Sequence, residues 1–128
     1  MREIVLDTET TGMDPNEGHR IIEIGAIELD NHLPTGRTLH LYINPERDVP
    51  DEAVAVHGLT TEFLSDKPVF AEVVGEYVDF VEGAKLVIHN AAFDVKFLNW
   101  ELKTLGFPSV DQRLVVDTLD IARRAFPG

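Results

Sequence analysis

The spacing of apolar residues changes halfway along the chain, and this change restricts the possible fold more than any other feature. In the first half, residues 21–29 and 38–43 alternate between apolar and polar side chains, which is typical of strands. Residues 3–8 add an apolar run that also predicts a strand. In residues 68–81 the apolar positions instead recur every three or four residues, which predicts an amphipathic helix ending near Gly83.

The order of these elements predicts the sheet. Three consecutive strands with short connections indicate an antiparallel meander. A short apolar strand follows at 86–88, then a helix between Asn90 and Gly106, a strand at 115–116 and a helix over 118–126. We expect the Asn90 side chain to cap the helix after it. Because strands and helices alternate here, the later strands should pair in parallel, giving a mixed α/β sheet covered by helices.

Composition limits the class of protein. The 128 residues, 44% of them hydrophobic, suffice for one domain over residues 1–128 with its own core. No cysteine is present, which excludes disulfides and thiolate metal sites. We find neither a membrane-spanning stretch nor a signal peptide, so a soluble, cytoplasmic protein without membrane contact is expected. A net charge of −12 argues against tight, sequence-specific DNA binding, yet permits an enzyme that meets nucleic acid through bound metal ions.

Two acids, Asp7 and Glu9, stand at the end of the first apolar run. Residues two apart on a strand point to the same side, so both carboxylates should face one spot. Such anions repel each other unless a proton or a hard cation lies between them, and oxygen ligands suit Mg²⁺ or Mn²⁺. The pair therefore indicates either a metal site or an acidic strand end whose charges are solvated.

A third acid, Asp94, falls one turn into the helix that follows strand 86–88. Ligands of open α/β sheets gather at the carboxyl ends of strands, so Asp94 should approach Asp7 and Glu9 if the two strands are neighbours. Three converging carboxylates meet the requirement of two-metal phosphoryl transfer. The alternative is that Asp94 only complements the dipole of its helix.

Four ordered segments carry a family resemblance: Val5–Gly12, Ile21–Ala26, Val56–Thr60 and Val87–Asp94. Together they resemble the DEDDh 3′–5′ exonucleases, and among these the epsilon proofreading subunits of bacterial DNA polymerase III. The similarity covers essentially the whole chain. It implies a ribonuclease H-like fold, with a mixed five-stranded sheet of order 3-2-1-4-5 flanked by helices and C-terminally incomplete.

The resemblance also implies a function, in which single-stranded DNA 3′ ends are hydrolysed to nucleoside 5′-monophosphates during proofreading. Asp7, Glu9 and Asp94 would be catalytic and would bind two divalent metal ions, Mg²⁺ or Mn²⁺. The positions implied to contact the 3′-terminal nucleotide are Asp7, Glu9, Thr10, Glu52, His57, Asn90 and Phe93. The implied partners are the catalytic (alpha) subunit and the small accessory (theta) subunit of the polymerase.

One departure from the family pattern leaves alternatives open. The third motif, a His followed five positions later by an Asp, should come after the helix that begins near Thr118, and the sequence ends at Gly128. That His would be the general base and that Asp a metal ligand. His89 and Asp94 show the same spacing but belong to the second motif, and His19, His32 and His40 are interpreted as ordinary loop or strand histidines.

Two explanations account for the missing motif. The chain is part of a longer active protein, or it ends at Gly128 and is an inactive fragment that binds the polymerase. A related DEDDh ribonuclease that trims RNA 3′ ends is the third alternative.

Overall fold

Five strands form one mixed sheet in the computed structural model, which describes residues 1–125. The strands are β1 (Arg2–Thr10), β2 (Ile21–Asp30), β3 (Leu33–Tyr42), β4 (Lys85–Ile88) and β5 (Val115–Asp117). Their order is β3-β2-β1-β4-β5. β2 pairs antiparallel with both β1 and β3, whereas β4 pairs parallel with both β1 and β5. The predicted meander, parallel half and strand order are confirmed.

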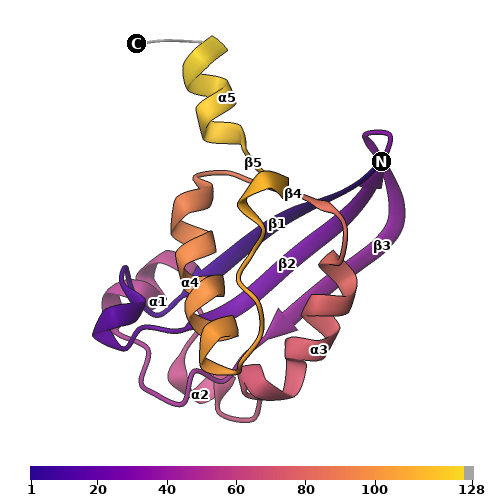
Figure 1. Ribbon diagram of the computed structural model, residues 1–128. Coiled ribbons are helices and arrows are strands. Elements are labelled where there is room, and N and C mark those ends of the chain that lie inside the picture. Colours follow the sequence, from indigo (N-terminus) through magenta and orange to yellow (C-terminus); the bar gives the residue numbers. More distant parts are fainter. Residues whose placement is uncertain (126–128) are drawn as a thin grey trace.

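Two long helices cover one face of this sheet (Figure 1). They are α3 (Phe70–Val81) and α4 (Ala91–Thr104), close to the predicted ranges. The short elements α1 (Asp51–His57), α2 (Thr61–Leu64), η1 (Pro15–Glu17) and η2 (Gln112–Leu114) were not predicted, and α5 (Thr118–Ala125) projects from the body. The predicted end of that last helix, at Phe126, lies outside the described residues.

The core lies between the sheet and the two long helices. On β2, the predicted alternation is confirmed from Ile24 onward: Ile24, Ala26 and Glu28 are buried, whereas Ile27 on the opposite face is 47% exposed. At the start of β2 the prediction is wrong: Ile21 packs in this core and Ile22 packs with Val49 and Leu64 instead, because the pairing with β1 shifts register there. Burial of the Glu28 carboxylate is possible because Arg2 and Arg37 donate hydrogen bonds to it at 2.7 and 2.9 Å. One face of the sheet is therefore packed, and the other is open over β1 and β2.

The register of the sheet places the carboxyl ends of β1 and β4 near each other. Val5 of β1 pairs with Val87 of β4, so the two parallel strands end at the same edge. The start of α4 follows directly after β4 at this edge, as does the start of α5 after β5. Loops and helix starts therefore converge where the acids of β1 lie.

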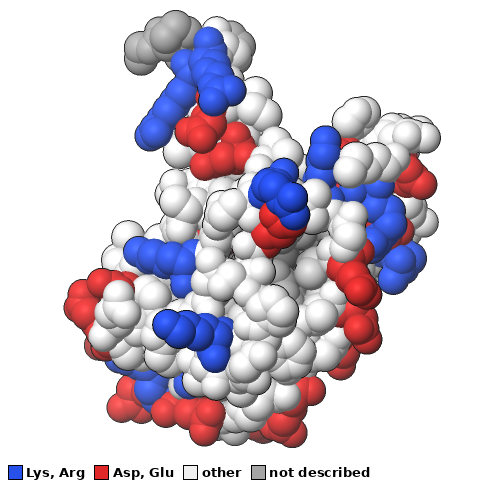
Figure 2. All heavy atoms as spheres, viewed as in Figure 1, with Lys and Arg blue, Asp and Glu red and all other residues white. Residues whose placement is uncertain are grey.

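Charges of both signs share the molecular face shown in Figure 2, with basic side chains on α5 and acidic ones along the α3 side. None of the helices in residues 1–125 has the length and apolar character that a membrane span needs.

Candidate active site

At the end of β1, acidic side chains lie on one side of the strand and threonine side chains on the other. Asp7 is exposed and Glu9 is half-buried, while Thr8 and Thr10 between and beside them are buried. This alternation places both carboxylates on the open side of the strand, as predicted. The pKa of Glu9 is raised, mainly by desolvation and then by the neighbouring charge of Asp7, while His57 acts in the opposite direction.

Asp94 meets the same strand from the helix side. It lies in the first turn of α4, is only 5% exposed, and accepts a hydrogen bond from the Thr8 hydroxyl. Its pKa is raised to about 6, mainly by burial and also by the charge of Asp7, although the bond from Thr8 acts to lower it. Asp94 therefore reaches β1 from the packed side of the sheet, close enough to Asp7 to feel its charge, and a role confined to the helix dipole does not account for its burial.

The donors of this acidic group match a hard divalent cation in chemistry. All three side chains offer carboxylate oxygens, and the charge of Asp7 raises the pKa of both other acids, so a bound cation would relieve their repulsion. Across residues 1–125, however, no three acidic or histidine side chains are arranged to hold a metal ion. Asp94 is instead bound to Thr8, so metal binding would require its carboxylate to reorient.

A cavity of about 520 Å³ opens beside these acids, between the end of β1, the loop that follows it, and α1. Glu9, Thr10, Glu52, His57 and Phe93, five of the positions that the family resemblance assigns to the nucleotide, line this cavity. The fold thus gathers residues from segments that lie far apart in the sequence. Its size and mixed polar and apolar lining suit a small organic group such as a nucleotide.

Two of the predicted nucleotide contacts lie elsewhere. Asp7 lines a neighbouring hollow of about 130 Å³ with Glu9, Glu23 and His40, where the His40 ring lies 2.6 Å from the Glu23 carboxylate. Asn90 is exposed at the start of α4 and does not line the cavity.

His57 is held by the protein through both ring nitrogens. The Leu59 backbone N–H donates to its Nδ1 at 3.0 Å, so Nδ1 carries no proton. The remaining nitrogen, Nε2, then donates to the Thr10 carbonyl at 3.2 Å. His57 therefore links the end of α1 to the backbone of the β1 loop, in addition to lining the cavity.

The loop after β1 is tightly braced. The Thr10 hydroxyl donates to the Gly12 carbonyl at 2.6 Å, and the Thr11 hydroxyl, which accepts the Arg20 N–H, lies 2.9 Å from Nδ1 of His19. The His19 ring covers Gly12 so closely that a Cβ at Gly12 would lie 2.4 Å from it. Gly12 is thus required by this close approach.

Interpreting His19 as an ordinary loop histidine missed its place in the cavity wall. Its contacts with Thr11 and Gly12 depend on how the loop folds back, and sequence spacing carries no signal of that.

An ion pair ties the same loop to α4. Glu101 is 2% exposed, and the Arg20 guanidinium donates to its two oxygens at 2.7 and 2.9 Å. Arg20 also stacks over the Trp100 ring at 5.4 Å. The loop lining the cavity and the helix bearing Asp94 are therefore connected as one unit.

The predicted helix cap at Asn90 is wrong. Its side chain makes no capping hydrogen bond, and its backbone is left-handed, with φ 59°. The Asp117 carboxylate accepts the first N–H groups of α4 instead, at 3.0 and 3.1 Å. In the left-handed conformation an Asn side chain does not reach its own helix in the manner of an ordinary cap.

This sheet order, with helices packed on it and acids at the end of its central strand, is that of ribonuclease H-like nucleases. The model of the exonuclease (RNase T) family matches residues 4–128, and the chain therefore belongs to this exonuclease family.

Curated relatives are named DNA polymerase III subunit epsilon. The protein from Rickettsia conorii is 54% identical over 131 residues, covering 100% of this chain and 57% of the relative. That from Escherichia coli K12 is 52% identical over 134 residues, covering 99% of this chain and 55% of the relative. The chain thus spans somewhat more than half the length of these relatives.

Solved structures agree on the fold. Exonuclease X in complex with 5′ overhanging duplex DNA is 26% identical with a TM-score of 0.74, and the match covers 98% of this chain and 65% of that one. Escherichia coli exonuclease I with a dT13 oligonucleotide has a TM-score of 0.86 at 19% identity, over 98% of this chain and 29% of that one, which supports the fold alone.

Proposed function

We propose that the protein is a metal-dependent 3′–5′ exonuclease that removes nucleotides from single-stranded DNA ends as nucleoside 5′-monophosphates. The observation that carries this proposal is the acidic group at the end of β1, in which the charge of Asp7 raises the pKa of both Glu9 and Asp94, and in which Glu9 lines the cavity. Such acids cannot serve as a phosphate-binding surface by themselves, because they repel the anion they would meet. They suit a centre that brings phosphate and cations together.

Asp7, Glu9 and Asp94 would hold two divalent cations, Mg²⁺ or Mn²⁺, which supply charge neutralisation at the phosphate and an activated water. Side chains that line the cavity would bind the base and the sugar of the nucleotide. Phe93 offers an apolar surface for the base or sugar, and Glu52 an acceptor for a sugar hydroxyl.

Other residues would hold the wall of the cavity in place around the terminal nucleotide. His57 fixes the Thr10 carbonyl, and the bond from Thr10 to Gly12 fixes the loop that would enclose the nucleotide. Asn90, which lies outside the cavity, would contribute through its backbone turn at the start of α4 instead of by direct contact.

The biological setting is replication. Relatives that match this chain over its full length are subunits of DNA polymerase III, so the substrate would be a mispaired 3′ end of newly made DNA. The partners would be the catalytic (alpha) subunit and the small accessory (theta) subunit of that polymerase.

The test uses the whole protein and a single-stranded DNA oligonucleotide labelled at its 5′ end. With Mg²⁺ the expected products are oligonucleotides shortened one residue at a time, together with nucleoside 5′-monophosphates. The double variant Asp7→Asn, Glu9→Gln should lose at least about 1,000-fold in rate, since metal and catalytic groups act as a unit. Glu3→Gln, which neutralises an acid near the start of the same strand, should retain the activity of the unaltered protein.

Full activity of the double variant would refute the site. An RNA oligonucleotide of the same sequence provides the second arm, and faster cleavage of RNA than of DNA would replace this proposal by the ribonuclease alternative.

A further inference from the structure

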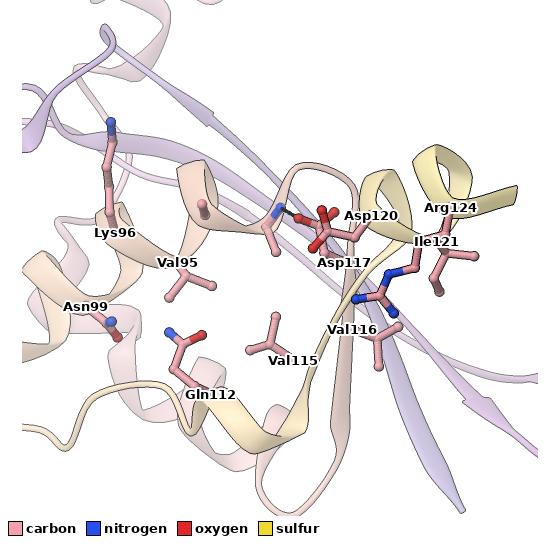
Figure 3. A pocket seen from close by; sticks show the side chains of 12 residues that line it. Val95, Lys96, Asn99, Gln112, Val115, Val116, Asp117, Asp120, Ile121 and Arg124 are labelled. Atoms are coloured by element: carbon pink, nitrogen blue, oxygen red, sulfur yellow. Dashed lines mark hydrogen bonds between the residues drawn. The ribbon is translucent and has the colours of Figure 1, made fainter. Parts of the chain in front are cut away.

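One carboxylate joins the starts of two helices at the edge of the sheet. Asp117, the last residue of β5, accepts hydrogen bonds from the backbone N–H groups of Asn90 at 3.0 Å, Ala91 at 3.1 Å and Leu119 at 2.9 Å. Figure 3 shows Asp117 between the beginnings of α4 and α5, with the bond to α4 drawn as a dashed line. Local sequence patterns do not predict this arrangement, because its donors lie up to 27 residues away from Asp117.

The sheet determines where Asp117 stands. Ile88 of β4 and Asp117 of β5 are partners in the parallel ladder, so the carboxylate lies beside the turn that leads from β4 into α4. Both of its oxygens are used by the first two N–H groups of this turn. A negative charge at a helix start is also favoured by the helix dipole. The side chain of Asp117 therefore attaches the start of α4 to β5.

The turn held by Asp117 is under strain. Asn90 has φ 59° and ψ 56°, a left-handed conformation that costs a non-glycine residue free energy and persists only where its surroundings impose it. Its own side chain makes no capping bond. A nearby bond, 3.0 Å between His89 Nδ1 and the Thr118 hydroxyl, joins the residue after β4 to the start of α5. This bond does not involve the backbone N–H groups at the start of α4, which donate to Asp117.

We propose that Asp117 is a positioning residue of the exonuclease site, which sets the first turn of α4 and thereby the place of Asp94 and Phe93. The Phe93 N–H donates to the Asn90 carbonyl at 3.2 Å, so the turn is built directly on the residue that Asp117 holds. Asp94 is the next residue, and it reaches Thr8 of β1 from this turn. The inference rests on the proposed function.

The experiment compares Asp117→Asn with Asp111→Asn in the whole protein. Asp111 also caps a short helix, accepting the Arg113 N–H at 3.0 Å, and its carboxylate is bonded to Arg113 instead of to the start of α4, so it is a matched control for loss of a capping charge. For Asp117→Asn we expect kcat on a DNA 3′ end to fall about 10- to 100-fold, as for other residues that orient the groups of a metal site, with KM changed much less. The Mg²⁺ concentration for half-maximal rate should rise.

A second readout does not depend on activity. Amide hydrogen exchange at Asn90 and Ala91 should quicken in Asp117→Asn and stay unchanged in Asp111→Asn, while the rest of the protein keeps its protection. Asp117→Ala extends the series, and Asp117→Asn stays informative if the alanine variant fails to fold, because its amide oxygen still accepts a hydrogen bond.

An Asp117→Asn protein with unchanged kcat and Mg²⁺ dependence would overturn the inference, as would equal losses in the Asp111→Asn control. Its failure differs from failure of the proposed function, which would appear as an unaltered protein that does not shorten DNA 3′ ends at all.

Discussion

Replacing Asp94 by Asn should make the protein more stable while removing its activity. The carboxylate is buried at the foot of α4, and keeping it ionised there costs free energy because water is displaced and Asp7 lies near. An Asn side chain has nearly the same shape and can accept the hydrogen bond from the Thr8 hydroxyl. Because Asn carries no charge, the free-energy cost of burying an ionised group disappears, while the hydrogen bond to Thr8 is kept.

The size of the effect follows from the pKa of Asp94, which rises from 3.8 to about 6 on folding. The folded state binds this proton more tightly than the unfolded state, so the stability from the protonated group is complete below 3.8 and is lost as the pH rises through 6. The full shift corresponds to about 3 kcal/mol, and solvent screening at the open edge of the site reduces it to about 1–2 kcal/mol.

Urea denaturation of the whole protein in the presence of EDTA measures this difference. At pH 8 the free energy of unfolding of Asp94→Asn should exceed that of the unaltered protein by about 1–2 kcal/mol, and at pH 4.5 by about half to two-thirds of that. Asp79→Asn, at an exposed acid on α3, controls for the change in net charge. A stability gain that is absent at pH 8, or equal at both pH values, would refute the reasoning.

Two further predictions concern the loop beside the cavity. Gly12→Ala should raise KM for DNA 3′ ends at least about tenfold, since its Cβ would collide with the His19 ring. Adding His19→Ala should reverse much of this rise in KM, and steady-state kinetics of the single and double variants measure both effects. Arg20→Ala should lower the free energy of unfolding by about 3–5 kcal/mol because it leaves Glu101 buried and unpaired, whereas the double variant Arg20→Met, Glu101→Leu should recover most of it. Urea denaturation of each variant measures that recovery, and equal losses in the single and double variants would contradict the assignment.

The sheet could be predicted from the sequence because local patterns determine most of it. Alternation on β2 from Ile24 onward and the apolar run before Asp7 indicate which faces are packed, and the structure confirms both. The beginning of β3 was missed: residues 33–37 are exposed, so no buried face imposes a pattern, and pairing with β2 alone makes them a strand. Similarly, α1 is too short, and too exposed, to show a helical period.

The acidic group was predictable for a different reason. Asp7 and Glu9 are two residues apart on one strand, and Asp94 follows the neighbouring parallel strand, so local spacing and sheet order suffice to bring them near one another. His19 and Asp117 act through contacts that the loop and the strand register create, and these depend on the complete fold. Residues of that kind become visible only in three dimensions.

The most direct test of the account is a crystal structure of the whole protein with Mn²⁺ and a nucleoside 5′-monophosphate. We expect anomalous peaks of Mn²⁺ bonded to carboxylate oxygens of Asp7, Glu9 and Asp94, with Asp94 turned away from Thr8, and the nucleotide in the cavity bordered by Phe93. Mn²⁺ bound elsewhere, with these three carboxylates left without metal while the nucleotide is present, would contradict the central claim.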